Sequence, residues 1–177
     1  MALKPTIYKV ELQLVDMNRD IYTGCKLTLA LHPSETQERM MVRLMAFGLN
    51  YHPGLQFCKG LSATDEADLW EVAPDGQVHH WIEVGQASAD RIRKGVSRSP
   101  KVSLYAYGRE SDIWWSRSQE AFKALPRVEV WQFNNEQTAQ LPALVGRNMS
   151  ITMTITGNEI YLNQNDLQLT LAFERLL

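Results

Sequence analysis

Two carboxylates, Asp68 and Glu83, have the spacing in this sequence that is best suited to chemistry. They flank two alternating apolar runs that predict the strands of a β-hairpin, with a tight turn between them. If Asp75-Gly76 are the two central turn residues, Trp70 opposes Trp81 and Asp68 opposes Glu83. Opposed side chains lie roughly 5 Å apart at Cβ, where like charges repel unless a cation lies between them. The spacing therefore predicts a site for a divalent metal.

The prediction depends on the type of turn. A three-residue Pro74-Asp75-Gly76 loop with a glycine bulge would oppose Asp68 to Ile82 and move Glu83 to the other face of the sheet. Two acidic residues at the solvated rim of a hairpin are also an ordinary arrangement. We take the two-residue turn as the working register and keep both alternatives open.

Other polar residues could complete such a site. The carboxylates of Asp68 and Glu83 and the carbonyl of Val84 are hard oxygen ligands, which suit magnesium or manganese. Glu38 lies at the edge of the apolar arc of a predicted helix, so we expect it to reach the metal directly or through water, or else to pair with a nearby arginine. The basic stripe, by which we mean Arg91, Lys94 and Arg98 of the helix after Glu83, is a candidate for binding phosphates.

An Asp on one strand, a Glu on the next and a basic helix after them are similar to the arrangement in PD-(D/E)XK nucleases. The segments HPSETQERMMVRLMAFGL, DEADLW, WIEVGQ, RIRKG and VSLYAYG resemble the YaeQ family in order and spacing, and the resemblance covers the whole chain. It implies a small cytoplasmic bacterial protein with a variant of the restriction-endonuclease-like fold. It also implies that an acidic residue of the first core helix, here Glu38, contributes to the site.

The sequence departs from the nuclease motif at one position. The motif lysine stands two residues after the acidic residue, and here that position is Gly85, which cannot polarise a water molecule. Lys94 on the following helix is our first candidate for a displaced lysine, and Gln86 is the second. Two functions remain open. One is a metal-dependent phosphodiesterase, a nuclease-like enzyme acting on DNA or RNA, and the other is a non-catalytic relative that binds nucleic acid or a protein partner.

The elements that must position these residues form an α+β fold. Ser34 is expected to cap a helix that runs to about Leu49, and Ser88 a second helix. A strand at 102–107 then makes a parallel crossover, and a third helix covers 111–125. The alternating N- and C-terminal strands should pair in an additional antiparallel sheet, beside a nuclease-like mixed sheet with flanking helices.

Length and composition set broad limits on the protein. A chain of 177 residues, with 45% hydrophobic and 21% charged residues, is expected to form a single domain over 1–177. No apolar run is long enough for a membrane span and no signal-peptide pattern is present, so we expect a cytoplasmic protein that does not enter a membrane. The net charge of −2 gives no general attraction for nucleic acid, so any such binding requires a local patch.

Overall fold

The computed structural model describes residues 3–59 and 64–177, which form a mixed α+β fold. Its strands are β1 (Thr6–Asp16), β2 (Ile21–Leu31), β3 (Leu55–Phe57), β4 (Leu69–Val72), β5 (Val78–Val84), β6 (Val102–Ala106), β7 (Val128–Phe133), β8 (Asn148–Thr156), β9 (Glu159–Gln164) and β10 (Leu167–Arg175). The α-helices are α1 (Gln37–Leu49), α2 (Ala89–Arg98), α3 (Ser111–Lys123) and α4 (Asn135–Thr138), and a 3₁₀ helix covers Leu141–Leu144. None of the helices in these ranges is both long and apolar enough to cross a membrane.

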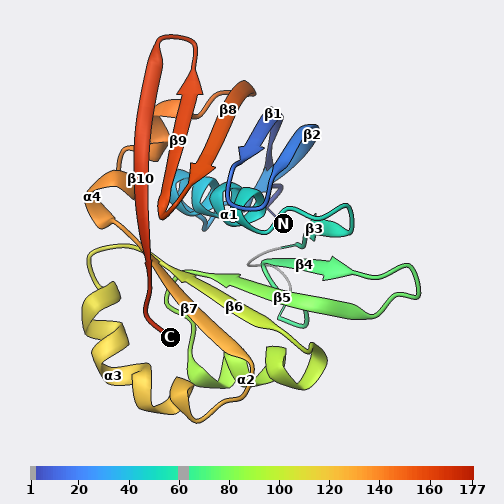
Figure 1. The fold of residues 1–177 in the computed structure, drawn as a ribbon, viewed down its shortest axis with the longest axis vertical. Helices are drawn as coiled ribbons and strands as arrows, with labels where there is room; N and C mark the ends of the chain where they lie inside the picture. The colour runs from blue at the N-terminus through green and yellow to red at the C-terminus, as the bar shows by residue number, and fades with distance from the viewer. Residues whose placement is uncertain (1–2, 60–63) are drawn as a thin grey trace.

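The strands form one continuous sheet in the order β2-β1-β8-β9-β10-β7-β6-β5-β4-β3. The prediction of a separate second sheet differs from this structure, because β10 pairs with β9 along its first part and with β7 at its end. In Figure 1 the long strand β10 passes from the upper half of the sheet to the lower half. The N- and C-terminal strands do pair as expected, but β1 and β8 are parallel rather than antiparallel.

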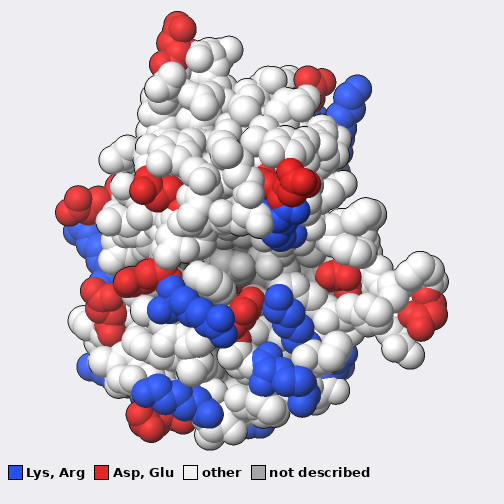
Figure 2. Space-filling model, in the orientation of Figure 1, with Lys and Arg blue, Asp and Glu red and all other residues white. Residues whose placement is uncertain are grey.

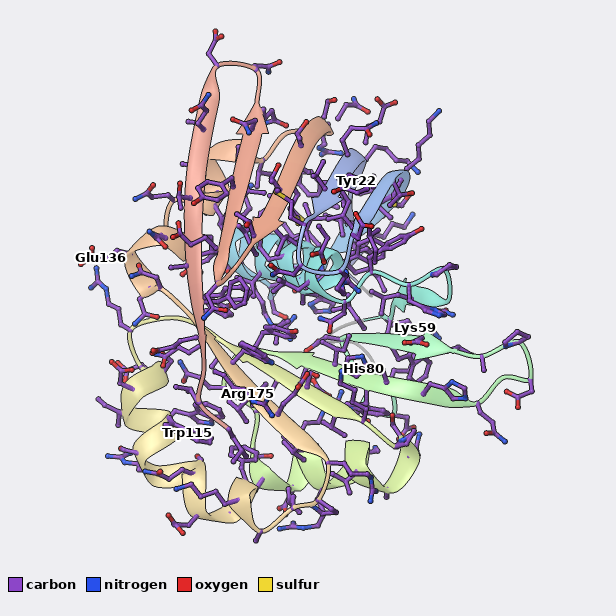
Figure 3. All side chains as sticks on the ribbon, viewed as in Figure 1. Tyr22, Lys59, His80, Trp115, Glu136 and Arg175 are labelled. Atoms are coloured by element: carbon purple, nitrogen blue, oxygen red, sulfur yellow. The ribbon has the colours of Figure 1, made fainter. Side chains whose placement is uncertain are left out.

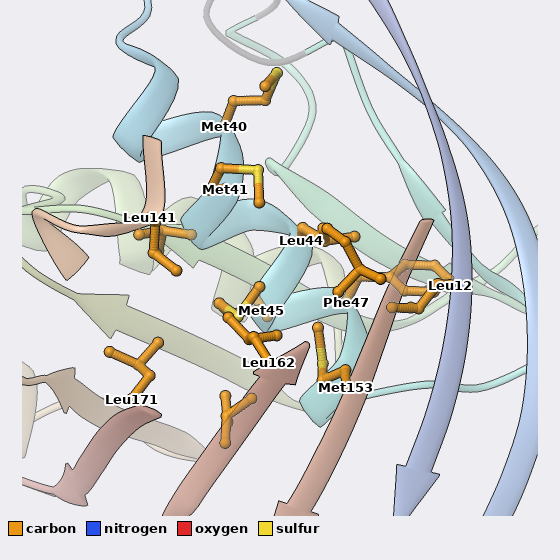
Figure 4. Packing of buried hydrophobic residues seen from close by; sticks show 14 of the residues in the cluster. Leu12, Met40, Met41, Leu44, Met45, Phe47, Leu141, Met153, Leu162 and Leu171 are labelled. Atoms are coloured by element: carbon orange, nitrogen blue, oxygen red, sulfur yellow. The ribbon is translucent and has the colours of Figure 1, made fainter. Parts of the chain in front are cut away.

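Helix α1 fills the space between the two halves of the sheet. Its residues 40–48 are all buried, because the helix is apolar around most of its circumference. Figure 4 shows Met41, Leu44 and Met45 packed among side chains from the strands, including Leu162 and Leu171. A helix buried in this way presents its few charged side chains to other parts of the protein interior. The candidate site described below lies where these side chains meet the sheet.

Helices α2 and α3 cover the opposite face of the lower half of the sheet (Figure 1). Ser88 caps α2 as predicted, by accepting a hydrogen bond from the Arg91 backbone N–H. The predicted crossover is also present, since β5 and β6 are parallel. Gly95 of α2 lies against the buried Trp81, and a Cβ at this position would be 2.7 Å from the indole ring. This close approach sets α2 directly beside the β5 residues that follow Trp81.

The start of α1 differs from the prediction. The N-cap is Thr36, whose hydroxyl accepts a hydrogen bond from the Arg39 backbone N–H, and not Ser34. Ser34 instead contacts the ring of His32. The segment before Thr36 therefore makes a turn of its own, and Glu35 lies in it rather than on the helix.

The β4-β5 hairpin has the predicted register at the site, but a different turn. Gly76 has a positive φ of 86°, and Ala73 and Gln77 close a three-residue loop around it. This loop alone would give the alternative register. A bulge beside Val72 then shifts the pairing by one residue, so that Trp70 opposes Trp81. The two irregularities compensate, and the register near the carboxylates is that of the two-residue turn.

Candidate active site at the carboxylate pair

Asp68 and Glu83 are brought together as the hairpin register requires. Asp68 precedes β4, and its backbone N–H donates to the Ile82 carbonyl at 3.1 Å. The two carboxyl groups share a hydrogen bond, and both residues are 3% exposed. Asp68 Oδ2 also accepts from the Val84 backbone N–H at 2.9 Å. Two carboxyl groups in contact inside a protein require compensation by a proton, by cations or by both.

The two carboxyl groups have opposite pKa shifts. Burial raises the pKa of Glu83 to about 9, and the charge of Asp68 and the shared hydrogen bond add to this effect. Burial also disfavours the charge of Asp68, but the Arg39 guanidinium and the hydrogen bonds from Glu83 and the Val84 N–H hold its pKa below the ordinary value. At neutral pH the pair therefore carries one proton, on Glu83, and one negative charge, on Asp68.

Each carboxylate has its own arginine. Arg39 Nη2 of α1 lies 2.8 Å from Asp68 Oδ1. Arg91 Nε of α2 lies 2.7 Å from Glu83 Oε1, and the same oxygen accepts from the Trp81 indole N–H at 2.8 Å. The pair is thus held between the two helices that lie on opposite faces of the sheet.

Arg39 belongs to a larger buried ion-pair network with Glu35 and Arg43. Arg39 Nη1 lies 2.6 Å from Glu35 Oε2, and Arg43 binds both oxygens of Glu35 at 2.7 and 2.9 Å. The side chains of Glu35 and Arg43 are 2% and 3% exposed. Arg43 also donates to the Ala30 carbonyl of β2. Glu35 is therefore a fixed anchor for Arg39.

The carboxylate pair opens into a cavity of about 600 Å³. The described residues that line it are Arg39, Thr64, Asp68, Glu83, Val84, Gly85, Gln86, Ala87, Arg91, Tyr107, Gly108, Arg109 and Glu110. When Glu83 is protonated, the arginines that line the cavity outnumber the charged carboxylates that line it. The cavity therefore carries net positive charge. Such a cavity attracts anions although the whole chain has a charge of −2.

Gly85 has a φ of +96°, a conformation that L side chains rarely adopt. A lysine at the motif position would therefore strain the backbone. Gln86, the second candidate for the role of that lysine, does line the cavity, and its amide donates to the Tyr107 carbonyl at 3.3 Å.

Lys94 lies elsewhere. Its ammonium group is 2.8 Å from both the Thr64 carbonyl and the Asp65 carboxylate, and it does not line the cavity. Arg98 similarly donates to the Asp65 carbonyl at 2.9 Å. Arg91 is the member of the basic stripe that reaches the site, and its guanidinium also donates to the carbonyls of Thr64 and Glu66. The basic stripe is thus aligned as expected, but it holds the 64–66 segment against α2.

Glu38 remains at the periphery of the site. It is half-buried, and within the described residues it forms no ion pair with Arg39 or Arg43. Burial is the main reason that the pKa of Tyr107 is raised, and the nearby charge of Glu38 contributes to this shift. Glu38 therefore lies close to Tyr107 at the cavity wall, but not among the lining residues.

The oxygen ligands of the pair suit a magnesium or manganese ion in type, and an ion of this kind is commonly bound by one or two carboxylates with water in its other positions. Among residues 3–59 and 64–177, no group of three or more His, Cys, Asp and Glu side chains is arranged to hold a metal. The site offers two carboxylates and, from the main chain, the Val84 carbonyl. The positively charged guanidinium of Arg39 occupies the position between two of these groups, since its Nη2 lies 2.8 Å from Asp68 Oδ1 and 3.5 Å from the Val84 carbonyl.

A second polar cluster lies on the lower half of the sheet, where Figure 3 labels His80. His80 Nε2 is 2.7 Å from Ser103 Oγ, and the Ser103 hydroxyl donates to Glu129 at 2.6 Å. Burial and the charge of Lys101 lower the pKa of His80 to about 4, so the ring is neutral at pH 7. Because the serine donates its proton to the glutamate, the histidine does not activate it as a nucleophile. His79 is exposed, so the adjacent histidines lie in different surroundings.

The residues that sequence reasoning missed are Arg39, Glu35, Tyr107 and Arg109. Helical spacing alone places Glu35, Arg39 and Arg43 together on one charged side of the helix, a pattern that is typical of a solvent-facing surface. A signal was present, because residues 40–48 are apolar except for Arg43. A helix of this kind is surrounded by protein, so its charged positions must face an interior polar site.

Comparison with known proteins agrees with this architecture. The family model described as "YaeQ protein" matches residues 1–173. Relatives named "Uncharacterized protein YaeQ" are 39% identical in Salmonella typhi and 38% identical in Escherichia coli (strain K12), over 97% of this chain and 97% of theirs.

Two crystal structures are similar over nearly their whole length. The YaeQ protein from Xanthomonas axonopodis pv. citri superposes with a TM-score of 0.93 at 36% identity, over 97% of this chain and 98% of that one. The YaeQ protein from Pseudomonas syringae also gives 0.93 at 36% identity, over 98% and 96%. The chain therefore belongs to the YaeQ family.

Proposed function

We propose that this protein is a metal-dependent phosphodiesterase, with a nuclease-like site that acts on DNA or RNA. The observation that carries the proposal is the contact between two buried carboxyl groups in a cavity lined by three arginines. Such a pair is costly for folding, and groups with strongly shifted pKa values in a cavity are typical of functional sites. The fold is compatible with a variant of the PD-(D/E)XK arrangement, which forms part of the proposal.

In this proposal Asp68, Glu83 and the Val84 carbonyl hold a magnesium or manganese ion. The ion would supply a polarised water molecule and charge stabilisation for the phosphate. The chain's own residues have separate tasks. Arg91 and Arg109 bind phosphate oxygens in the cavity, and Trp81 fixes the orientation of Glu83 through its indole N–H. Gln86 can accept a hydrogen bond from a water molecule in the cavity and so orient it.

The charge distribution favours an extended anionic substrate. Figure 2 shows Lys and Arg side chains gathered over the lower half of the molecule, with acidic groups among them. A further cavity of about 250 Å³ in this half is lined by Lys101, Arg127 and Arg175 together with Glu129. These local basic groups can bind phosphates at a distance from the carboxylate pair, as nucleic-acid binding by a weakly acidic protein requires.

One observation favours the non-catalytic alternative. None of the described residues that line the cavity is a lysine, and Arg39 is paired with Asp68 where a metal would bind. A protein of this kind would bind nucleic acid, or a protein partner, through its arginines without cleaving a bond.

A cleavage assay distinguishes the two functions. Single-stranded and double-stranded DNA and RNA would be incubated with the protein and magnesium or manganese, and with a chelator. The phosphodiesterase proposal predicts metal-dependent cleavage that Glu83→Gln abolishes and that Asp90→Asn, at an exposed carboxylate of α2, leaves unchanged. Binding without cleavage by the parent protein would instead support the alternative, and neither binding nor cleavage would reject both.

A further inference from the structure

The position of Arg39 has a consequence for metal binding. Its Nη2 contacts Asp68 Oδ1 at 2.8 Å and lies 3.5 Å from the Val84 carbonyl, and these are two of the three groups that the proposed function assigns to a metal. A guanidinium remains charged at any pH that a folded protein tolerates. It cannot leave the site by losing a proton, as a lysine could.

Arg39 is also attached at a second point. Its Nη1 lies 2.6 Å from Glu35 Oε2, and Arg43 holds Glu35 through both oxygens. Glu35 and Arg43 are almost completely buried, whereas the Arg39 side chain is 15% exposed and lines the cavity. Glu35 therefore keeps the guanidinium close to the site even when its contact with Asp68 is broken.

We infer that Arg39 is a tethered cation that occupies the metal position and competes with a divalent ion for Asp68 and the Val84 carbonyl. This inference rests on the proposed function. Two positive groups bound to one carboxylate oxygen and one carbonyl would lie within a few ångströms of each other and repel strongly in a buried site. Arg39 must turn away from Asp68 before the metal binds, toward Glu35 and the open cavity.

The arrangement has a physical benefit for the metal-free protein. Without Arg39, Asp68 would be a buried carboxylate whose remaining partners, among the residues that the structure describes, are the Glu83 proton and one backbone N–H. A buried charge left in this way is costly. Arg39 thus neutralises Asp68 when no metal is present, and it makes the site selective for ions that bind strongly enough to displace it.

The inference is tested by titrating the protein with manganese alone and measuring the heat of binding. Arg39→Met keeps the length of the side chain and removes its charge, so it should raise manganese affinity by about tenfold or more. Arg39→Lys keeps the charge but loses the guanidinium fork, and it should have an intermediate affinity. The matched control is Arg93→Met, which removes an arginine that pairs with Asp90 at the surface of α2 and should leave the affinity unchanged.

Circular dichroism before the titration establishes that each variant is folded, and Arg39→Lys provides the test if Arg39→Met is not. Manganese affinity that is equal to or weaker than that of the parent in both Arg39 variants would overturn the inference, while leaving the proposed function intact if the parent binds the ion. If neither the parent nor any Arg39 variant binds manganese, the inference and the metal-dependent function both fail.

Discussion

Replacing Glu83 by glutamine should stabilise the protein at pH 8, although it removes a buried residue of the candidate site. In the parent, Glu83 donates its proton to Asp68, and its Oε1 accepts from Trp81 and Arg91. A glutamine amide has a donor and an acceptor in the corresponding places. The variant can therefore keep the hydrogen bonds of the protonated glutamate without the need to bind a proton.

The direction of the pH dependence follows from linkage. The pKa of Glu83 is raised to about 9 in the folded protein, above the ordinary value of 4.5 that applies to the unfolded chain. Between these values the folded state binds more protons than the unfolded state, so the free energy of unfolding falls as pH rises. The contribution of protonated Glu83 to the free energy of unfolding is fully present below about pH 4.5 and is lost by about pH 9. Glu83→Gln removes this loss, which is on the order of a few kcal/mol.

Chemical denaturation of the parent and Glu83→Gln at intervals from pH 5 to pH 8.5 measures the effect. The difference in unfolding free energy should grow in favour of the variant as pH rises. The neutral, buried His80 makes its own contribution in the acid range, but it is present in both proteins and cancels in the difference. Asp90→Asn, at an exposed position, should give a curve parallel to that of the parent. Parallel curves for Glu83→Gln as well would show that Glu83 is ionised in the folded protein.

Replacing Arg43 by methionine should cause a large loss of stability, about 3–5 kcal/mol. Arg43 binds both carboxylate oxygens of Glu35 and the Ala30 carbonyl, and its side chain is 3% exposed. Without it, Glu35 would be a buried carboxylate held by Arg39 alone among these charged partners. Urea denaturation of the parent and the variant at pH 7 measures the loss.

The double variant Glu35→Leu with Arg43→Met is the control for this effect. Removing both buried charges together should recover a large part of the stability that Arg43→Met loses, since a buried ion pair and a well-packed apolar pair are often similar in stability. The two changes are therefore expected to be strongly non-additive. A loss below about 1 kcal/mol for Arg43→Met would contradict this account, because that is the value of a solvated surface ion pair.

The contact between Asp68 and Glu83 was predictable from the sequence, but its structural cause was not. The pairing of Trp70 with Trp81 follows from alternation and from the length between the strands. The loop is nevertheless the three-residue one, and the bulge beside Val72 restores the register. A bulge depends on how the strand fits its neighbours, so a local pattern does not reveal it.

The partners of the carboxylates could be predicted less well, because they come from tertiary packing. Arg39 lies 29 residues before Asp68 in the sequence and reaches it because α1 packs between the two halves of the sheet. Lys94 is the first candidate from the sequence for a displaced lysine, because it lies on the helix that follows Glu83. In the structure the Lys94 ammonium group is instead bound to the Thr64 carbonyl and the Asp65 carboxylate. Helical spacing specifies the face on which a side chain lies, but not the group that faces it.

The central claim is that Asp68, Glu83 and the Val84 carbonyl hold a divalent metal, and manganese anomalous scattering from crystals of the protein soaked in the ion tests it most directly. The account predicts a single strong peak in the cavity, bonded to these three groups, with the Arg39 guanidinium turned away from Asp68. Crystals at saturating manganese that show no peak there, with Arg39 still paired to Asp68, would contradict it.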